Sequence, residues 1–292
     1  MALAARTGAV YDRGYRPYDG PRGGRGAARV ALYKASVRRA IGLRRSWRQK
    51  FLPLGLLAVV TIPAAVNVGI AFATRNSPLR GFQFFDYREY VGVSSALLLF
   101  VAVCAPDVIC PDRRQRVLPV IFARPLTGAD YALAKLGAIA SIIFAFSFLP
   151  QVLLFVGQML VSGSALHYAR DHAAVLWEVP VAVAALALYY AALGLALASL
   201  TSRRVVAGAS ILGLTLVSSV VAGILHDAGR ATVISLLSLP LYVRDLIFLG
   251  HVHEGSPLSG VAGGGALALA GYVVVVGVCL GVLFWRYRWA ER

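Results

Sequence analysis

Charged residues are scarce in this chain of 292 residues: Asp, Glu, Lys and Arg together make up 14%, whereas soluble domains contain roughly 25%. Hydrophobic residues make up 59%, and the mean hydropathy is +0.71. At about 20 apolar residues per helical span, the chain has room for about five to seven spans. The composition therefore excludes an ordinary soluble enzyme and predicts an all-α integral membrane protein.

Acidic residues and cysteines are also few. The chain has 13 Asp and Glu against 29 Lys and Arg, which gives a formal net charge of +16. In a membrane protein such an excess gathers on the cytoplasmic side, so we expect membrane lipids and no nucleic acid as partners. Cys104, Cys110 and Cys279 all lie in apolar segments, which favours buried thiols over a disulfide framework.

Apolar runs long enough to cross a bilayer occur six times. The predicted spans are 51–73, 90–111, 132–163, 173–200, 205–225 and 264–285. A seventh run, 233–249, is marginal in length and contains Pro240, Arg244 and Asp245, and charges are costly at mid-bilayer. We therefore predict an external re-entrant or interfacial helix at 233–249, between spans five and six.

The positive charges give the orientation of these spans. Six spans with a cytoplasmic N-terminus put 23 of the 29 Lys and Arg on the cytoplasmic side, a strong positive-inside bias. A seventh span would move the arginines after residue 285 to the outside. We predict a multi-pass protein of the bacterial cytoplasmic membrane with both termini in the cytoplasm.

The segment before the first span divides into two parts. Residues 1–27 are rich in Gly, Arg, Tyr and Pro and lack periodicity, which predicts a disordered basic tail. In 28–50 apolar residues recur at helical spacing with basic residues mostly off that stripe. This pattern is typical of an amphipathic helix in the headgroup region of an anionic leaflet; a solvated basic leader is the alternative. Residues 51–292 form the six-span domain.

Residues 112–126 (DRRQRVLPVIFARPL) are too charged for lipid and too apolar for a free loop. Pro111 is predicted to end the second span, and Pro125 follows a short turn of helix. The predicted apolar face consists of Leu118, Ile121 and Phe122, and the basic face of Arg113, Arg114, Arg116 and Arg124. An ordinary positive-inside loop is the alternative, but such loops are usually shorter and less apolar. We predict a cytoplasmic helix that docks a partner.

A longer pattern surrounds this helix. It comprises Asp112-Arg113-Arg114, Leu118, Val120-Ile121-Phe122-Ala123-Arg124-Pro125-Leu126-Thr127, Tyr131 and Lys135. This pattern resembles the region after the second span in type-2 permeases of ATP-binding cassette (ABC) transporters. The chain departs from it at Arg116-Val117, where Gly-Thr is usual, and at Pro119, where an acidic residue is common. An amphipathic helix before six spans, and an apolar external segment between the last two, extend the resemblance to most of the chain.

The resemblance implies an exporter subunit with no chemistry of its own. Two permease copies, identical or different, would form the pathway, and two copies of a separate ATPase would bind ATP and Mg²⁺. The chain contains no Gly-Lys-Ser/Thr, the core of a P-loop, so we expect neither an enzyme nor a bound cofactor. Residues 28–50 would be the connecting helix and 112–126 the coupling helix. The residues implied in ATPase docking are Asp112, Arg113, Arg114, Arg116, Leu118, Ile121, Phe122, Arg124 and Pro125. The cargo stays open.

Small residues at four-residue spacing occur in two spans. They are Ala209 with Gly213 and Ser219 with Gly223 in the fifth, and Gly277 with Gly281 in the sixth. Such spacing lets helices approach closely, although small residues are common in membrane helices generally. Because the second and fifth spans line the pathway in the resembled family, Ala209, Gly213, Ser218, Ser219 and Gly223 are candidates for the pathway or the dimer contact.

Asp107 is the acid placed well within a span, which makes it a functional candidate. A proton or cation relay is one interpretation, and pairing with a nearby arginine is the one that we favour. His251, His253 and Glu254 are suitable ligand types for a metal, but solvated loop histidines are commoner, so we predict no metal site.

Two other functions stay open. The first is a stand-alone secondary transporter or channel, against which stand the lack of an apparent inverted repeat and the single deep acid. The second is a membrane scaffold or assembly factor.

Overall fold

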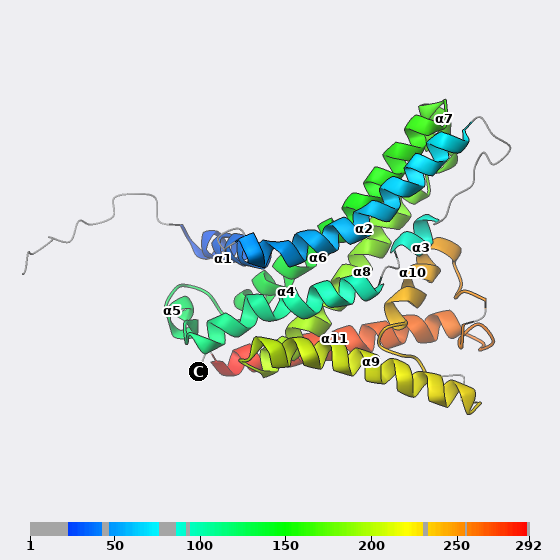
Figure 1. Cartoon of the computed structure of the whole chain (residues 1–292). Helices are drawn as coiled ribbons and strands as arrows, with labels where there is room; N and C mark the ends of the chain where they lie inside the picture. The colour runs from blue at the N-terminus through cyan, green and yellow to red at the C-terminus, as the bar shows by residue number, and fades with distance from the viewer. Residues whose placement is uncertain are drawn as a thin grey trace, which may run out of the picture.

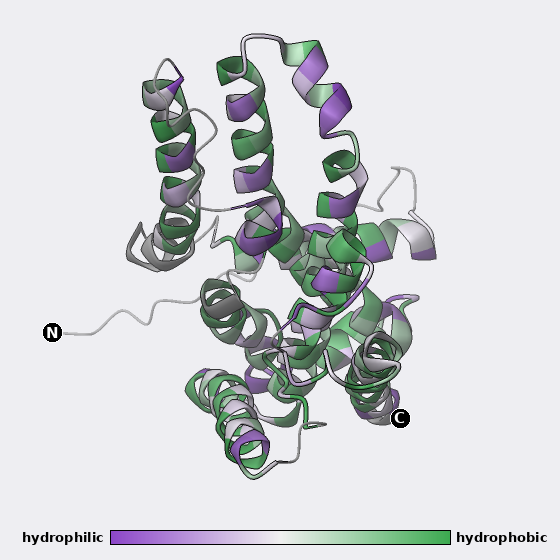
Figure 2. Cartoon of the chain, turned by 90° about the vertical axis from the view of Figure 1, so that its right-hand side faces the viewer, coloured by the Kyte–Doolittle hydropathy of each residue, from purple (hydrophilic) through white to green (hydrophobic). Residues whose placement is uncertain are grey.

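The computed structural model describes residues 23–42, 47–75, 86–91, 94–229, 233–254 and 256–290, and all regular elements in these ranges are helices (Figure 1). Six helical stretches are long and apolar enough to cross a membrane. They are Gly55–Thr74, Tyr87–Arg114, Gly128–Val161, Val175–Leu200, Arg204–Asp227 and Gly264–Arg288. Figure 2 shows how hydrophobic residues dominate these long helices. The predicted all-helical, multi-pass class and the six-span pattern are confirmed at this level.

The described ranges contain long and short helices. The long ones are α2 (Trp47–Thr74), α4 (Ser94–Arg114), α6 (Gly128–Val161), α8 (Val175–Leu200), α9 (Arg204–Asp227) and α11 (Gly264–Ala290). The short ones are α1 (Arg25–Ala40), α3 (Tyr87–Val91), α5 (Leu118–Phe122), α7 (Ala165–Asp171) and α10 (Leu239–Leu249).

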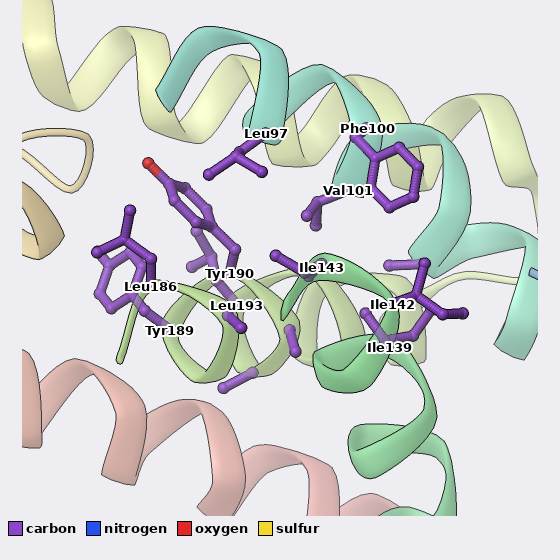
Figure 3. Packing of buried hydrophobic residues seen from close by; sticks show 14 of the residues in the cluster. Leu97, Phe100, Val101, Ile139, Ile142, Ile143, Leu186, Tyr189, Tyr190 and Leu193 are labelled. Atoms are coloured by element: carbon purple, nitrogen blue, oxygen red, sulfur yellow. The ribbon is translucent and has the colours of Figure 1, made fainter. Parts of the chain in front are cut away.

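The core of the bundle lies between α4, α6 and α8. Figure 3 shows Leu97 and Val101 of α4, Ile143 of α6, and Tyr190 and Leu193 of α8 directed toward one another. α8 is buried on nearly all sides because it also packs against α10 and α11, as expected of a helix that is hydrophobic all round. α2 and α9 lie at the periphery, α2 along α6 and α9 along α4.

The two ends of the bundle differ in composition. One end, called here the charged end, contains α1, α5, the last turns of α4, α8 and α11, and the first turns of α6 and α9 (Figure 1). The opposite end contains α3, α7 and α10. At the opposite end, α2 and α6 diverge from α9 and α11 (Figure 1).

Two helix boundaries at the charged end differ from the prediction. α1 ends at Ala40, not near residue 50, because Gly42 adopts a left-handed backbone (φ 75°) that ends the helix. Pro111 does not end the second span, since α4 continues to Arg114. A proline removes one intrahelical hydrogen bond, and the side-chain contacts of Asp112, described below, hold this last turn in place.

The end of α4 is a Schellman cap. The N–H of Val117 donates to the carbonyl of Asp112 (3.1 Å), and the N–H of Arg116 donates to the carbonyl of Arg113 (3.2 Å). Arg116 is left-handed (φ 53°), the conformation in which this cap normally has glycine. The cap turns the chain sharply, so that α5 covers only Leu118–Phe122 of the predicted 112–126 element. The segment 233–249 is likewise helical only in α10, from Leu239.

Candidate functional site

A buried carboxylate joins three helices at the charged end. Asp112, in the last turn of α4, is 1% exposed. Its Oδ2 accepts hydrogen bonds from Lys135 Nζ (2.7 Å) and Tyr131 Oη (2.9 Å), both on α6. Its Oδ1 accepts a hydrogen bond from Arg39 of α1. Three donors around one carboxylate satisfy the requirement that a buried charge be paired and hydrogen-bonded.

Lys135 is the basic member of this buried set. Its side chain is 2% exposed, and its ammonium group also donates to the carbonyl of Val108 (3.0 Å). The ring of Tyr131, which is fully buried, lies 4.7 Å from the ring of Tyr287 on α11. The set therefore connects α1, α4, α6 and α11 at one point.

A second carboxylate fixes the start of α1 to the start of α6. Asp130 lies in a capping box with Thr127, in which each side chain accepts a hydrogen bond from the other's backbone N–H. Its two oxygens also accept from Arg25 Nε (2.7 Å) and Arg29 Nη2 (2.6 Å). Because both arginines are half exposed, each of these pairs alone contributes little to stability. However, together with Arg39, which pairs with Asp112 of α4, they fix α1 to the adjoining ends of α4 and α6.

Two further contacts tie α8 and α9 to α4. Arg113 donates to the carbonyl of Ser199, in the last turn of α8. Arg204, the first residue of α9, pairs with Asp107 of α4, with 2.8 Å between Nη1 and Oδ1. This is the kind of arginine contact that we favoured for Asp107 over a relay.

The α5 helix lies beyond these contacts and exposes one side. None of its residues is fully buried. Leu118, Ile121 and Phe122 are partly buried against the core of their own chain, and the ring of Phe122 lies 6.1 Å from that of Tyr131. The open side, called here the α5 outer face, consists of Arg116, Pro119, Val120, Ala123 and Arg124.

The predicted docking residues thus separate into two groups, and two predictions need correction. Asp112 is buried and bonded within the chain, so it does not lie on the surface predicted for it. The predicted apolar docking face, Leu118, Ile121 and Phe122, turns toward the core, because covering these side chains removes apolar surface from water. Most of the predicted docking arginines are on the surface. Arg114, Arg116 and Arg124 are exposed, as is Pro125, whereas Arg113 is partly buried.

The small residues singled out in α9 mostly lie away from the core. Ala209 and Gly223 are exposed, and side chains added at Gly213 or Gly223 would meet nothing within 4 Å. Ser219 donates to the carbonyl of Thr215, as Ser218 does, and Ser218 also accepts from the N–H of Leu236 (3.2 Å). α9 packs on α4 through another glycine, Gly208, where an added Cβ would lie 2.7 Å from the carbonyl oxygen of Ala102.

Sequence reasoning missed several residues that bind Asp112, Asp130 and Asp107 at the charged end. Lys135 and Tyr131 entered only through the resemblance, and Arg39, Asp130 and Arg204 were not singled out. One signal was present for Lys135: it is the single lysine after residue 50, and it stands at the start of an otherwise apolar span. An intramembrane lysine of this kind demands an acidic partner.

The opposite end shows a smaller polar contact. On α10, Arg244 donates two hydrogen bonds to Asp245 Oδ1, at 2.9 and 2.6 Å. Burial raises the pKa of the Tyr242 hydroxyl in the same helix above its usual value. Within the described ranges no group of three or more His, Cys, Asp and Glu side chains could hold a metal ion. His253 instead lies 3.4 Å from Arg88, measured from Nδ1 to Nη1.

Comparison with protein-family models and with curated proteins finds no match to this chain. The site is therefore characterised by its geometry: the ion pairs of Asp112 and Asp130 lie at the charged end, beside the short helix α5 with its exposed outer face.

Proposed function

We propose that this chain is the membrane-spanning permease subunit of an ABC exporter. Two permease copies form the substrate pathway, and a separate ATPase subunit binds each copy at the charged end. The observation that carries the proposal is the α5 outer face, an exposed apolar and basic surface beside the buried ion pair that joins the flanking helices α4 and α6.

The α5 outer face has the composition of a protein contact. Val120 is 68% exposed at its centre, with the exposed Arg116 and Arg124 on either side in the sequence. An apolar centre with arginines is typical of protein interfaces. Next to it, a groove of about 360 Å³ runs between α1 and α5, lined by Ala28, Leu32, Ala35, Val120 and Arg124 among others. A partner side chain could insert there.

The short connections of α5 to α4 and α6 would allow a force on α5 to reach these two spans. Three residues separate α5 from the end of α4 and five separate it from the start of α6, and Asp112 and Lys135 join α4 and α6 through a buried ion pair. Asp130 and Asp112 both bind α1. A push on α5 or α1 is therefore passed directly to α4 and α6, because a packed interior transmits strain.

The orientation follows from charge. We place the charged end in the cytoplasm of a bacterial cell, because the segments predicted to be cytoplasmic contain 23 of the 29 Lys and Arg of the sequence, and the described parts of these segments lie at that end. The ATPase and its ATP are then on the side where α5 lies. The 233–249 segment, with α10, would be external.

The pathway and the dimer contact are assigned to the exposed side of α9. It displays Ala209, Leu216, Val220 and Gly223, with the half-buried Gly213 between the first two, in a stripe that recurs every three or four residues as in helix–helix seams. Small residues in such a stripe allow close approach of a second copy.

The proposal is tested by reconstituting the chain with an ABC ATPase encoded in an adjacent reading frame. Arg124→Glu reverses charge on the α5 outer face, and Arg286→Glu makes the same change at an exposed position of α11 at the same end. We expect Arg124→Glu to abolish co-purification of the ATPase and substrate transport, while Arg286→Glu keeps both. Undiminished association and transport in Arg124→Glu would contradict the proposal, and transport without any ATPase would favour a secondary transporter.

A further inference from the structure

A basic pocket lies at the charged end. It has a volume of about 390 Å³ and is bounded by α1, the end of α4 and the start of α9. Its polar walls are Arg38 and Arg39 of α1, Gln115 after α4, and Arg204 of α9, and Pro111 and Gly42 are among its other residues. Three guanidinium groups from two helices therefore converge on one cavity.

The pocket carries an excess of positive charge. Arg39 is paired with Asp112 and Arg204 with Asp107, each through one nitrogen. A guanidinium group has five N–H donors, so both arginines keep donors for another acceptor. Among the described residues no carboxylate lies within ion-pair distance of Arg38, whose side chain is exposed. None of the described residues that line the cavity carries a carboxylate.

Apolar surface begins where the pocket ends. Val205 and Val206 follow Arg204 directly, and Val205 is 83% exposed. On α4, Leu99 and Val103 are exposed and precede Asp107 at four-residue intervals, so the three lie on one face of the helix. Figure 1 shows α4 lying between α1 and α2 on one side and α9 on the other. An apolar strip thus leads away from the basic pocket along α4 and α9.

We propose that this pocket binds the phosphate group of an anionic amphiphile, whose acyl chain lies along the strip formed by Leu99, Val103 and Val206. Arginine suits the phosphate because its planar donors match phosphate oxygens two at a time. Basic pockets between membrane helices at the bilayer surface bind anionic headgroups for the same reason. The ligand chemistry is the same for a membrane phospholipid and for an amphiphilic cargo, and it does not depend on the proposed ATPase partner.

The test measures lipid binding to the purified full chain in a neutral detergent. The probes are a short-chain phosphatidylglycerol, the matching phosphatidylcholine, and inorganic phosphate. The variants are Arg38→Gln in the pocket and Arg286→Gln, which removes the same charge from an exposed site on α11. We expect phosphatidylglycerol to bind at least tenfold more tightly than either other probe, and Arg38→Gln to weaken it about tenfold, as expected for a lost hydrogen bond to a charged group.

Each remaining outcome decides one part of the proposal. Equal binding of phosphatidylglycerol and inorganic phosphate would overturn the role of the acyl chain, and equal binding of the two phospholipids would overturn the anionic site. Equal weakening by Arg38→Gln and Arg286→Gln would reduce the effect to general surface charge and overturn the pocket. Val206→Gln, which adds no charge, separates the two halves: we expect it to weaken phosphatidylglycerol binding and leave phosphate binding unchanged.

Discussion

Of the short helices outside the six spans, α5 lies at one end of the bundle and α10 at the other, and these two differ in what covers them. α10 has 11 residues, of which Leu239, Pro240, Tyr242, Val243 and Asp245 are buried against α8, α11 and their connections. α5 has five residues and none of them is buried. α10 is covered by its own chain, whereas α5 packs only three partly buried side chains, Leu118, Ile121 and Phe122, against the core and exposes its other side. α7, at the opposite end, also has no buried residue, so the contrast is between these two helices and not between the two ends. It supports the proposal that α5 meets a partner.

The largest effect is expected where the buried ion pair beside α5 is broken. Lys135→Met leaves Asp112 buried without its ammonium partner, and losing one member of a buried pair costs about 3–5 kcal/mol. We expect a corresponding loss in the free energy of unfolding in detergent, with loss of partner docking. The double variant Lys135→Met/Asp112→Asn removes both charges and should recover part of the stability. A single variant as stable as the wild type would show that the pair does not hold this end together.

The same comparison can be made within α9. Gly208→Ala places a Cβ against the carbonyl oxygen of Ala102 at 2.7 Å, and overpacking of this kind costs about 1–3 kcal/mol. Gly213→Ala meets open space, so the monomer should be unchanged or more stable by about 0.5–1 kcal/mol, because alanine favours a helix over glycine. Thermal unfolding of the two variants checks the difference, and equal midpoints would contradict the packing of α9 on α4.

The contrast between α10 and α5 is tested with one identical substitution in each. Val243 is 6% exposed and Val120 is 68% exposed. Val243→Ala removes buried methyl groups and should cost about 1–2 kcal/mol, whereas Val120→Ala should change stability by less than about 0.5 kcal/mol. Denaturant titration of the unfolding free energy gives both values. A larger loss at Val120 than at Val243 would reverse the comparison.

The smallest effect concerns the turn that presents α5. Arg116 is left-handed (φ 53°), a conformation that disfavours residues with a Cβ by about 1–2 kcal/mol. We expect Arg116→Gly to raise stability by about 1 kcal/mol. Arg116→Ala removes the same side chain but keeps the Cβ, so it should bring no gain. If alanine stabilised as much as glycine, the effect would come from charge and not from the backbone.

The sequence predicts the spans well and the contacts between them poorly. Six apolar runs are visible because a bilayer imposes length and hydropathy on each span. Which side of a span faces protein is not visible, because lipid and protein interior are equally apolar. The most apolar stretches of α8 and α9 have mean hydropathies of 2.2 and 2.1, yet 72% of that stretch is buried in α8 and only 22% in α9.

The candidate site shows the same limit. The pattern of 112–126 indicates an unusual element at the right place, but the face of α5 that turns inward depends on the packing partner that α6 provides, namely Tyr131 against Phe122. Pro111 signals a helix end by local rules, and tertiary contacts of the next residue, Asp112, override it. The positive φ of Arg116 could not be predicted from the sequence either, since glycine and not arginine is the usual residue at this position of a helix cap.

The most direct test of the central claim is a cysteine crosslink from α5 to the ATPase. The native Cys104, Cys110 and Cys279 are buried, so an introduced surface cysteine would dominate the reaction. Val120→Cys lies on the α5 outer face, and Leu166→Cys, at a position 74% exposed in α7, is the control at the opposite end. With the reconstituted ATPase and a short thiol-to-amine crosslinker, we predict a crosslinked product from Val120→Cys and none from Leu166→Cys. A product from Leu166→Cys alone, or from neither variant while the ATPase stays bound, would contradict the proposal that α5 is the docking site.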